Sequence, residues 1–108
     1  MEFLAAGAPR EIADAIEQLA RAQGHVTALV VPWESTASTL NMAVTAVKTD
    51  GWAIEHTNLG TISLTPLDET RTRVAIVAAE ADRPGDQTGA AAFDRFAQQV
   101  RRQFEVRP

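Results

Sequence analysis

Two histidines are the side chains of this sequence best suited to proton transfer near neutral pH, and neither has a clear catalytic companion. His25 directly follows Gly24, where a solvated or helix-capping role is expected, while His56 lies in an alternating apolar stretch. The chain has no cysteine and no HxxxH or HxH spacing, so no metal site is predicted. No G-x-S-x-G motif marks a nucleophile, and the glycines fit no phosphate-binding loop. These residues predict no particular reaction, and we expect no cofactor.

A binding site is the more concrete hypothesis, and it is built around His56 and Asn58. If every even residue from Trp52 to Leu64 faces one side of a strand, both polar side chains share a face with apolar ones. Polar groups on an apolar strand face must be hydrogen-bonded or line a water-filled cavity, since an unpaired buried polar group costs roughly 1–3 kcal/mol. The predicted ligand-binding residues, which include two aromatic walls and a helix residue, are His56, Asn58, Trp52, Trp33 and Phe96. The alternative is that Asn58-Leu59-Gly60 is a turn whose polar groups contact water.

Length and charge restrict the class of protein. The 108 residues are enough for one domain, 1–108, and 45% of them are hydrophobic, as in an ordinary globular protein. A net charge of −4 argues against nucleic acid as a partner, because phosphate binding needs clustered Lys and Arg. No apolar run approaches the roughly 18 residues of a membrane span, so no membrane partner is predicted. The start MEFLAAGAPRE has no basic region typical of a signal peptide, and a cytoplasmic location is expected.

The stretch from Gly60 to Glu105 organises the predicted fold. Apolar residues alternate in Gly60–Thr65 and again in Arg71–Ala79, which predicts two antiparallel strands. A polar loop over Asp82–Gly89, with Asp86 or Thr88 as cap, leads to a predicted helix over Ala90–Glu105. The helix has one apolar stripe at 3.6 residues per turn, formed by Phe93, Phe96, Ala97, Val100 and Phe104.

The first half of the chain supplies the remaining elements. Glu2–Ala6 is a candidate strand, and Pro9–Gln23 is predicted to be a helix with Pro9 at its first position and Gly24 at its end. The β-branched run His25–Val31 predicts a buried strand. Residues 39–48 fit either a strand or a helix; their threonines and valines, with the turn signal Asp50-Gly51, favour the strand.

The segments GTISLTPLDETRTRVAIVAAE and AAFDRFAQQVRRQFE, together with APREIADAIEQLA, carry a family resemblance. They are similar to the START/Bet v 1-like (polyketide cyclase/dehydrase) superfamily over residues 2–20 and 60–105. The resemblance implies a strand pair closed by a long C-terminal helix, with a ligand cavity between them. It implies no catalytic residues, because the family has no universal ones. This chain is shorter than the usual member, and its middle elements are abbreviated.

The predicted fold class is α+β: a mainly antiparallel sheet of four to six strands with both helices on one face. The first functional expectation is a small soluble domain that binds a small apolar ligand between the sheet and the C-terminal helix. One alternative is a protein-interaction or self-association module, with a homodimer as its assembly and a sheet edge or Ala75 and Val77 as its surface. The other is a cyclase- or dehydratase-like enzyme with His56 as acid/base. We favour a non-enzymatic protein.

Overall fold

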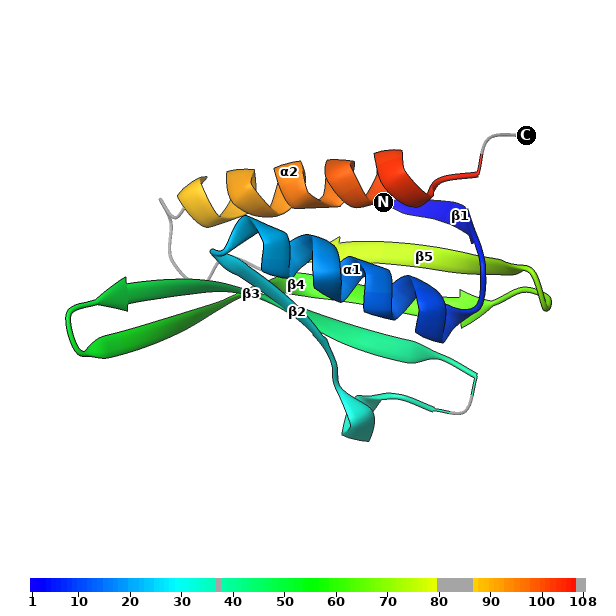
Figure 1. Cartoon of the computed structure of the whole chain (residues 1–108), viewed down its shortest axis with the longest axis horizontal. Coiled ribbons are helices and arrows are strands. Elements are labelled where there is room, and N and C mark those ends of the chain that lie inside the picture. The colour runs from blue at the N-terminus through cyan, green and yellow to red at the C-terminus, as the bar shows by residue number, and fades with distance from the viewer. Residues whose placement is uncertain (37, 80–86, 107–108) are drawn as a thin grey trace.

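The protein folds as one five-stranded antiparallel sheet with two helices on one of its faces (Figure 1). The structure is a computed structural model that describes residues 1–36, 38–79 and 87–106, and the side chains of these except 48–50, 53–56 and 87–90. The strand order is β1-β5-β4-β3-β2. The elements are, in chain order, β1 (Glu2–Ala6), α1 (Pro9–Gln23), β2 (Val26–Val30), the 3-10 turn η1 (Pro32–Glu34), β3 (Leu40–Asp50), β4 (Ala53–Pro66), β5 (Arg71–Ala78) and α2 (Gln87–Phe104). This confirms the predicted α+β class.

Helix α1 has the bounds that its sequence predicts. Pro9 occupies the start of the helix, where its missing N–H has no intrahelical partner to lose. Gly24 ends it with φ of 79°, the left-handed conformation that glycine adopts without a steric cost. One side of the helix faces the sheet and is buried, through Ile12, Ala13, Ile16 and Ala20. The helix therefore contributes an apolar stripe to the core and leaves its charged side in solvent.

The ambiguous stretch 39–48 belongs to a strand. β3 pairs with β2 along one side and with β4 along the other, so it is an interior strand of the sheet. A two-residue loop, Gly51-Trp52, joins β3 to β4, and Gly51 has φ of 62°. A glycine with positive φ at the first position of such a loop suits a tight hairpin turn. The Asp50-Gly51 signal is therefore confirmed.

β4 is one long strand with a bulge rather than two strands joined by a turn. Val44 of β3 pairs with Gly60, but the next residue, Thr45, pairs with Asn58. Leu59 is thus the extra residue on β4, and its side chain is buried. A bulge of this kind bends the strand and reverses which residues face the core on its two sides.

Helix α2 closes the core over β4 and β5. Its stripe Phe93, Phe96, Ala97 and Val100 is buried, and Phe104 packs partly against the same cluster. The helix begins at Gln87, earlier than predicted, so Gly89 and Thr88 lie within it rather than in a loop or cap. The other proposed cap, Asp86, lies outside the described residues. Over the described part of the chain, neither helix is long and apolar enough to cross a membrane.

Candidate functional site

The residues predicted to form a ligand pocket are not gathered in one place. Trp33 lies on η1 and Trp52 at the tip of the β3–β4 hairpin, with 84% and 103% of their surface exposed. Asn58 is also exposed, whereas Phe96 is buried in the core at 1% exposure. The backbone of His56 pairs with Val47 of β3, and its side chain lies outside the described set.

The bulge at Leu59 explains the position of Asn58. The expectation that even residues from 52 to 64 share one face assumes an unbroken alternation. Beyond the bulge Ile62 and Leu64 do face the core, but before it the alternation is shifted by one residue. The prediction that Asn58 shares the face of Ile62 is therefore wrong, because Asn58 is exposed while Leu59 takes the buried position.

Between the bulge and its turn, the β3–β4 hairpin extends past the rest of the sheet as a two-stranded ribbon (left in Figure 1). Among the described residues, the backbone hydrogen bond nearest the ribbon on the β2 side is the N–H of Val47 donating to the carbonyl of His25 at 3.0 Å. Its counterpart on the β5 side, again among described residues, is the N–H of Ala79 donating to the carbonyl of Leu59 at 2.9 Å. Trp52 is therefore held well away from the helices, and it does not wall a cavity with Trp33.

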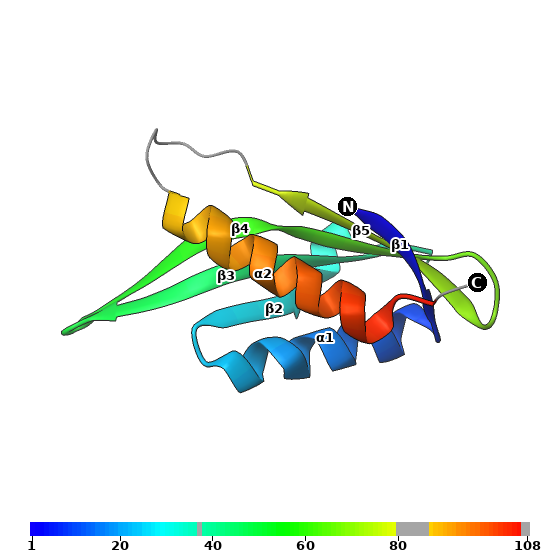
Figure 2. The same ribbon diagram turned by 90° about the horizontal axis from the view of Figure 1, so that it is seen from above.

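Both outer strands of the sheet are covered along part of their free sides. Val31 is hydrogen-bonded to Asn41, and Val47 to His25, between β2 and β3. In an antiparallel pair, hydrogen-bonded residue pairs alternate with pairs that are not bonded. The backbone groups of Val26 and Ala28 therefore point away from β3. These two residues are nevertheless only 2% and 1% exposed, because α1 lies alongside β2 (Figure 2).

At the other side of the sheet, the C-terminal segment covers β1. The N–H of Val106 donates to the carbonyl of Leu4 at 2.8 Å, and Glu105 forms a bridge with Ala5. An additional strand therefore has no free backbone edge to pair with at Val26 and Ala28 or at this part of β1.

The face of the sheet opposite the helices remains open, and a row of uncharged residues crosses it. Leu29 pairs with Ala43, Ala43 with Thr61, and Thr61 with Val77, so one residue from each of β2, β3, β4 and β5 lies in line. The two ends of the row are large and apolar, with Leu29 52% and Val77 61% exposed. The middle of the row is small. We call these four residues the cross-strand row.

The polar side chains beside the row are hydrogen-bonded to one another across the strands. The hydroxyl groups of Thr27 and Thr45 are bonded between β2 and β3. The Ser63 hydroxyl donates to Oδ1 of Asn41 at 2.6 Å between β4 and β3. The amide of Asn41 in turn donates to the carbonyl of Glu34. Because these groups already have protein partners, removing water from this face leaves few of them unsatisfied.

In the part of the open face whose side chains the structure describes, the charged residues lie on one side. None of its described side chains on β2, β3 and β4 is ionisable; they are those of Thr27, Leu29, Asn41, Ala43, Thr45, Val47, Asn58, Thr61, Ser63 and Thr65. The charged residues described on this face lie toward β1 and β5, at Glu2, Arg71 and Arg73. The chain as a whole is 22% charged, so this face is depleted of charge in the way that interface cores are.

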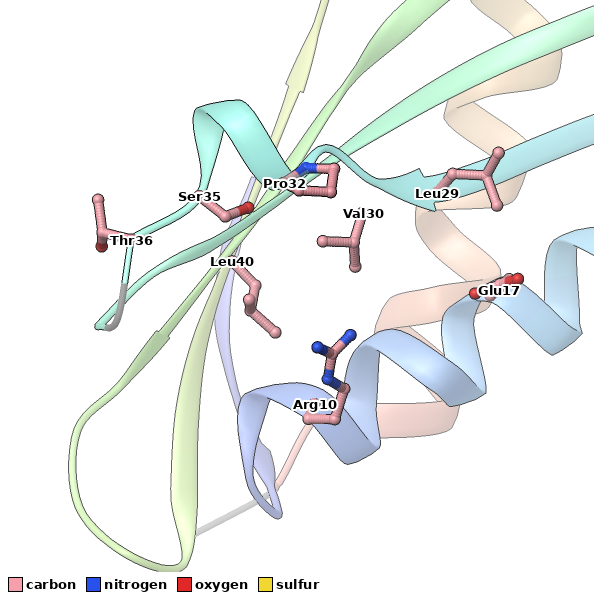
Figure 3. Close-up of a pocket in the computed structure, with 8 residues that line it drawn as sticks. All are labelled: Arg10, Glu17, Leu29, Val30, Pro32, Ser35, Thr36 and Leu40. Atoms are coloured by element: carbon pink, nitrogen blue, oxygen red, sulfur yellow. The ribbon is translucent and has the colours of Figure 1, made fainter.

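A separate groove of about 550 Å³ opens between α1, the end of β2, η1 and the start of β3 (Figure 3). It lies on the side of α1 that faces Val30 and Leu40, both of which pack against the core. Arg10 extends from α1 into this space, and Glu17 stands two turns further along the helix. The full lining is Arg10, Glu17, Leu29, Val30, Pro32, Ser35, Thr36 and Leu40.

Among the described acidic groups, one has a strongly lowered pKa: Asp68, in the turn between β4 and β5. The N–H of Thr70 donates to Oδ1 of Asp68 at 2.8 Å, and Nε of Arg71 donates to Oδ2 at 2.9 Å. The pKa of Asp68 is lowered from 3.8 to about 2. The largest cause is the backbone hydrogen bond from Thr70, followed by the hydrogen bonds from the side chains of Arg71 and Thr70. An exposed carboxylate held ionised by its own turn stabilises the hairpin and is not poised for proton transfer.

The open face was only partly visible in the sequence. Ala75 and Val77 could be assigned to an outward face from alternation alone, but Leu29 could not be placed beside them. Its partnership with Val77 depends on the strand order, which the sequence does not give. Comparisons with protein-family models, with curated proteins and with solved structures found no match to this chain.

Proposed function

We propose that this domain is a protein-interaction module that self-associates through the open face of its sheet. The observation that carries the proposal is the cross-strand row, a neutral strip with Leu29 at one end and Val77 at the other. The neighbouring polar side chains support it, since their cross-strand bonds lower the cost of losing water. Interfaces between protein copies combine such an uncharged centre with satisfied hydrogen bonds.

A second copy is the partner that the row fits best. Two sheets stacked face to face about a two-fold axis parallel to the strands would place Leu29 of one copy against Val77 of the other, twice. The small Ala43 and Thr61 in the middle would let the two backbones approach closely. Because the described side chains of β2, β3 and β4 on this face carry no charge, two copies of net charge −4 could meet there without opposing like charges.

The alternatives have less support from the structure. Strand addition would need free backbone groups, and those of Val26 and Ala28 are buried beside α1. An apolar ligand between the sheet and α2 would need room where Phe93 and Phe96 are already buried. The resemblance to the START/Bet v 1-like superfamily stays a proposal about the fold, and α2 laid across the β4–β5 pair supports it.

Sedimentation velocity over a range of concentrations tests the proposal. We expect the wild type to form a dimer and Leu29→Glu to raise its dissociation constant at least about tenfold, because a carboxylate would be buried without a partner. Leu67→Glu is the matched control, since Leu67 is also an exposed leucine but lies in the β4–β5 turn. A wild type that stays monomeric at millimolar concentration, or equal effects of the two variants, would contradict the proposal.

A further inference from the structure

Beyond self-association, we infer that the groove beside α1 binds a small amphipathic carboxylate, with its charged group on Arg10 and its apolar body on Val30 and Leu40. The groove is distinct from the space between the sheet and α2. The groove is open to solvent along one side, and its volume of about 550 Å³ is enough to hold part of a small molecule.

The charge of the groove favours an anion. Glu17 at one end is already paired, with Nη2 of Arg21 3.1 Å from its Oε1. Arg10 is exposed and takes part in no hydrogen bond or ion pair found between described residues, so the donors of its guanidinium contact water and are free to bind a ligand. The groove is thus locally positive although the chain carries a net charge of −4. A planar guanidinium matches a carboxylate with two parallel hydrogen bonds.

The remaining polar groups at the groove do not compete for that role. The Ser35 hydroxyl donates to the carbonyl of Val31 at 2.8 Å and accepts from the N–H of Asn41 at 3.0 Å. The Thr36 hydroxyl accepts from the N–H groups of residues 38 and 39. Both hydroxyl groups are therefore occupied in holding the loop that precedes β3, which leaves Arg10 as the polar anchor.

The apolar part of the site continues past Arg10. A second hollow of about 270 Å³ shares Arg10 and Leu40 with the groove and adds Pro9 and Pro66 to its walls. A ligand bound to Arg10 can therefore lay its apolar body along Val30 and Leu40 or reach toward the prolines. A peptide strand is the weaker fit, because on the free side of β2 the backbone groups of Val26 and Ala28 are buried and Val30 alone of this strand's outward-pointing residues lines the groove.

Fluorescence of Trp33, next to the groove residue Pro32, gives the test. In a Trp52→Phe background, which removes the other tryptophan, the chain is titrated with octanoate, 4-phenylbutyrate, octan-1-ol and octylamine. We expect one or both carboxylates to bind and Arg10→Gln to weaken that binding about tenfold, while Arg95→Gln, the same charge change on an exposed residue of α2, leaves it unchanged.

The two carboxylates separate the sources of the ligand. Binding of octanoate alone indicates an acyl chain, binding of 4-phenylbutyrate alone indicates an aromatic acid, and either result supports the site. No binding of either carboxylate, equal losses for Arg10→Gln and Arg95→Gln, or octylamine binding as tightly as the carboxylates overturns it.

Discussion

Ser63 and Asn41 face each other across β4 and β3, and the Ser63 hydroxyl donates to Oδ1 of Asn41 at 2.6 Å. The pair links the open face to the loop before β3, because the Asn41 amide also donates to the carbonyl of Glu34. Polar side chains on this face are therefore fixed by the protein itself rather than by water. This arrangement keeps a partly polar sheet face suitable for contact with another protein surface.

Ser63→Ala tests that relationship. The change removes the donor to Asn41 and leaves an amide oxygen without its partner. We expect the free energy of unfolding to fall by about 0.5–1.5 kcal/mol, as for an ordinary hydrogen bond, and dimer formation to weaken as well. Urea denaturation at a concentration too low for dimers measures the effect on unfolding. Sedimentation at a concentration where dimers form measures the effect on association. Thr61→Ala is the control for the urea measurement alone, since no side-chain bond of Thr61 is found among the described residues but Thr61 belongs to the cross-strand row. Equal losses in both variants would show that the Ser63–Asn41 bond contributes nothing.

Gly60→Ala tests the contact between β4 and α2. A Cβ added at Gly60 would overlap the carbonyl oxygen of Val77 and lie 2.5 Å from Cζ of Phe93. The backbone oxygen cannot move without disturbing β5, so we expect a loss of about 1–3 kcal/mol from overpacking. Adding Phe93→Leu should recover part of the loss by relieving the second contact. Thermal unfolding that shows no destabilisation by Gly60→Ala would mean that α2 does not pack against this glycine.

Phe96→Ala tests whether α2 closes the core. Phe96 is 1% exposed and belongs to the main cluster of buried side chains. Its truncation should cost about 3–5 kcal/mol, a large part of a small domain's stability. Asp94→Ala on the exposed side of the same helix should change the urea midpoint little. Similar small shifts for both would mean that the helix borders empty space or does not dock.

Asp68 makes the stability depend on acid pH. Its pKa is lowered from 3.8 to about 2, chiefly by the backbone N–H of Thr70, so the folded form favours the ionised carboxylate. The resulting stabilisation is fully present above the unfolded value of about 3.8 and disappears as pH falls through about 2. Asp68→Asn should therefore reduce the slope of stability against pH within that window. An NMR titration of the carboxyl group that gives an ordinary pKa would contradict the described turn geometry.

The elements of the fold were largely predictable because local patterns determine them. Pro9 and Gly24 bracket α1, and the threonines and valines of β3 favour a strand over a helix. The candidate site was not predictable in the same way. One extra residue, Leu59, shifts the alternation of β4 and moves Asn58 to the exposed side, and alternation alone does not reveal such a bulge.

The open face was predicted only in part, through Ala75 and Val77, and for a different reason. Leu29 and Val77 stand far apart in the sequence, and each alone is an ordinary exposed apolar residue. They lie in one line only because β3 and β4 sit between β2 and β5. Such a relationship depends on strand order and register, which a single sequence does not supply.

The most direct test of the proposed self-association is an isotope-filtered NOE experiment on a mixture of 13C-labelled and unlabelled chains. At a concentration where sedimentation shows a dimer, we predict contacts between methyl groups of Leu29 in one copy and Val77 in the other. These methyl groups are too far apart within one chain to interact, because Ala43 and Thr61 lie between them in the sheet. A dimer whose intermolecular contacts involve α1, α2 or the hairpin tip instead, or a sample that contains only monomer, would contradict the account.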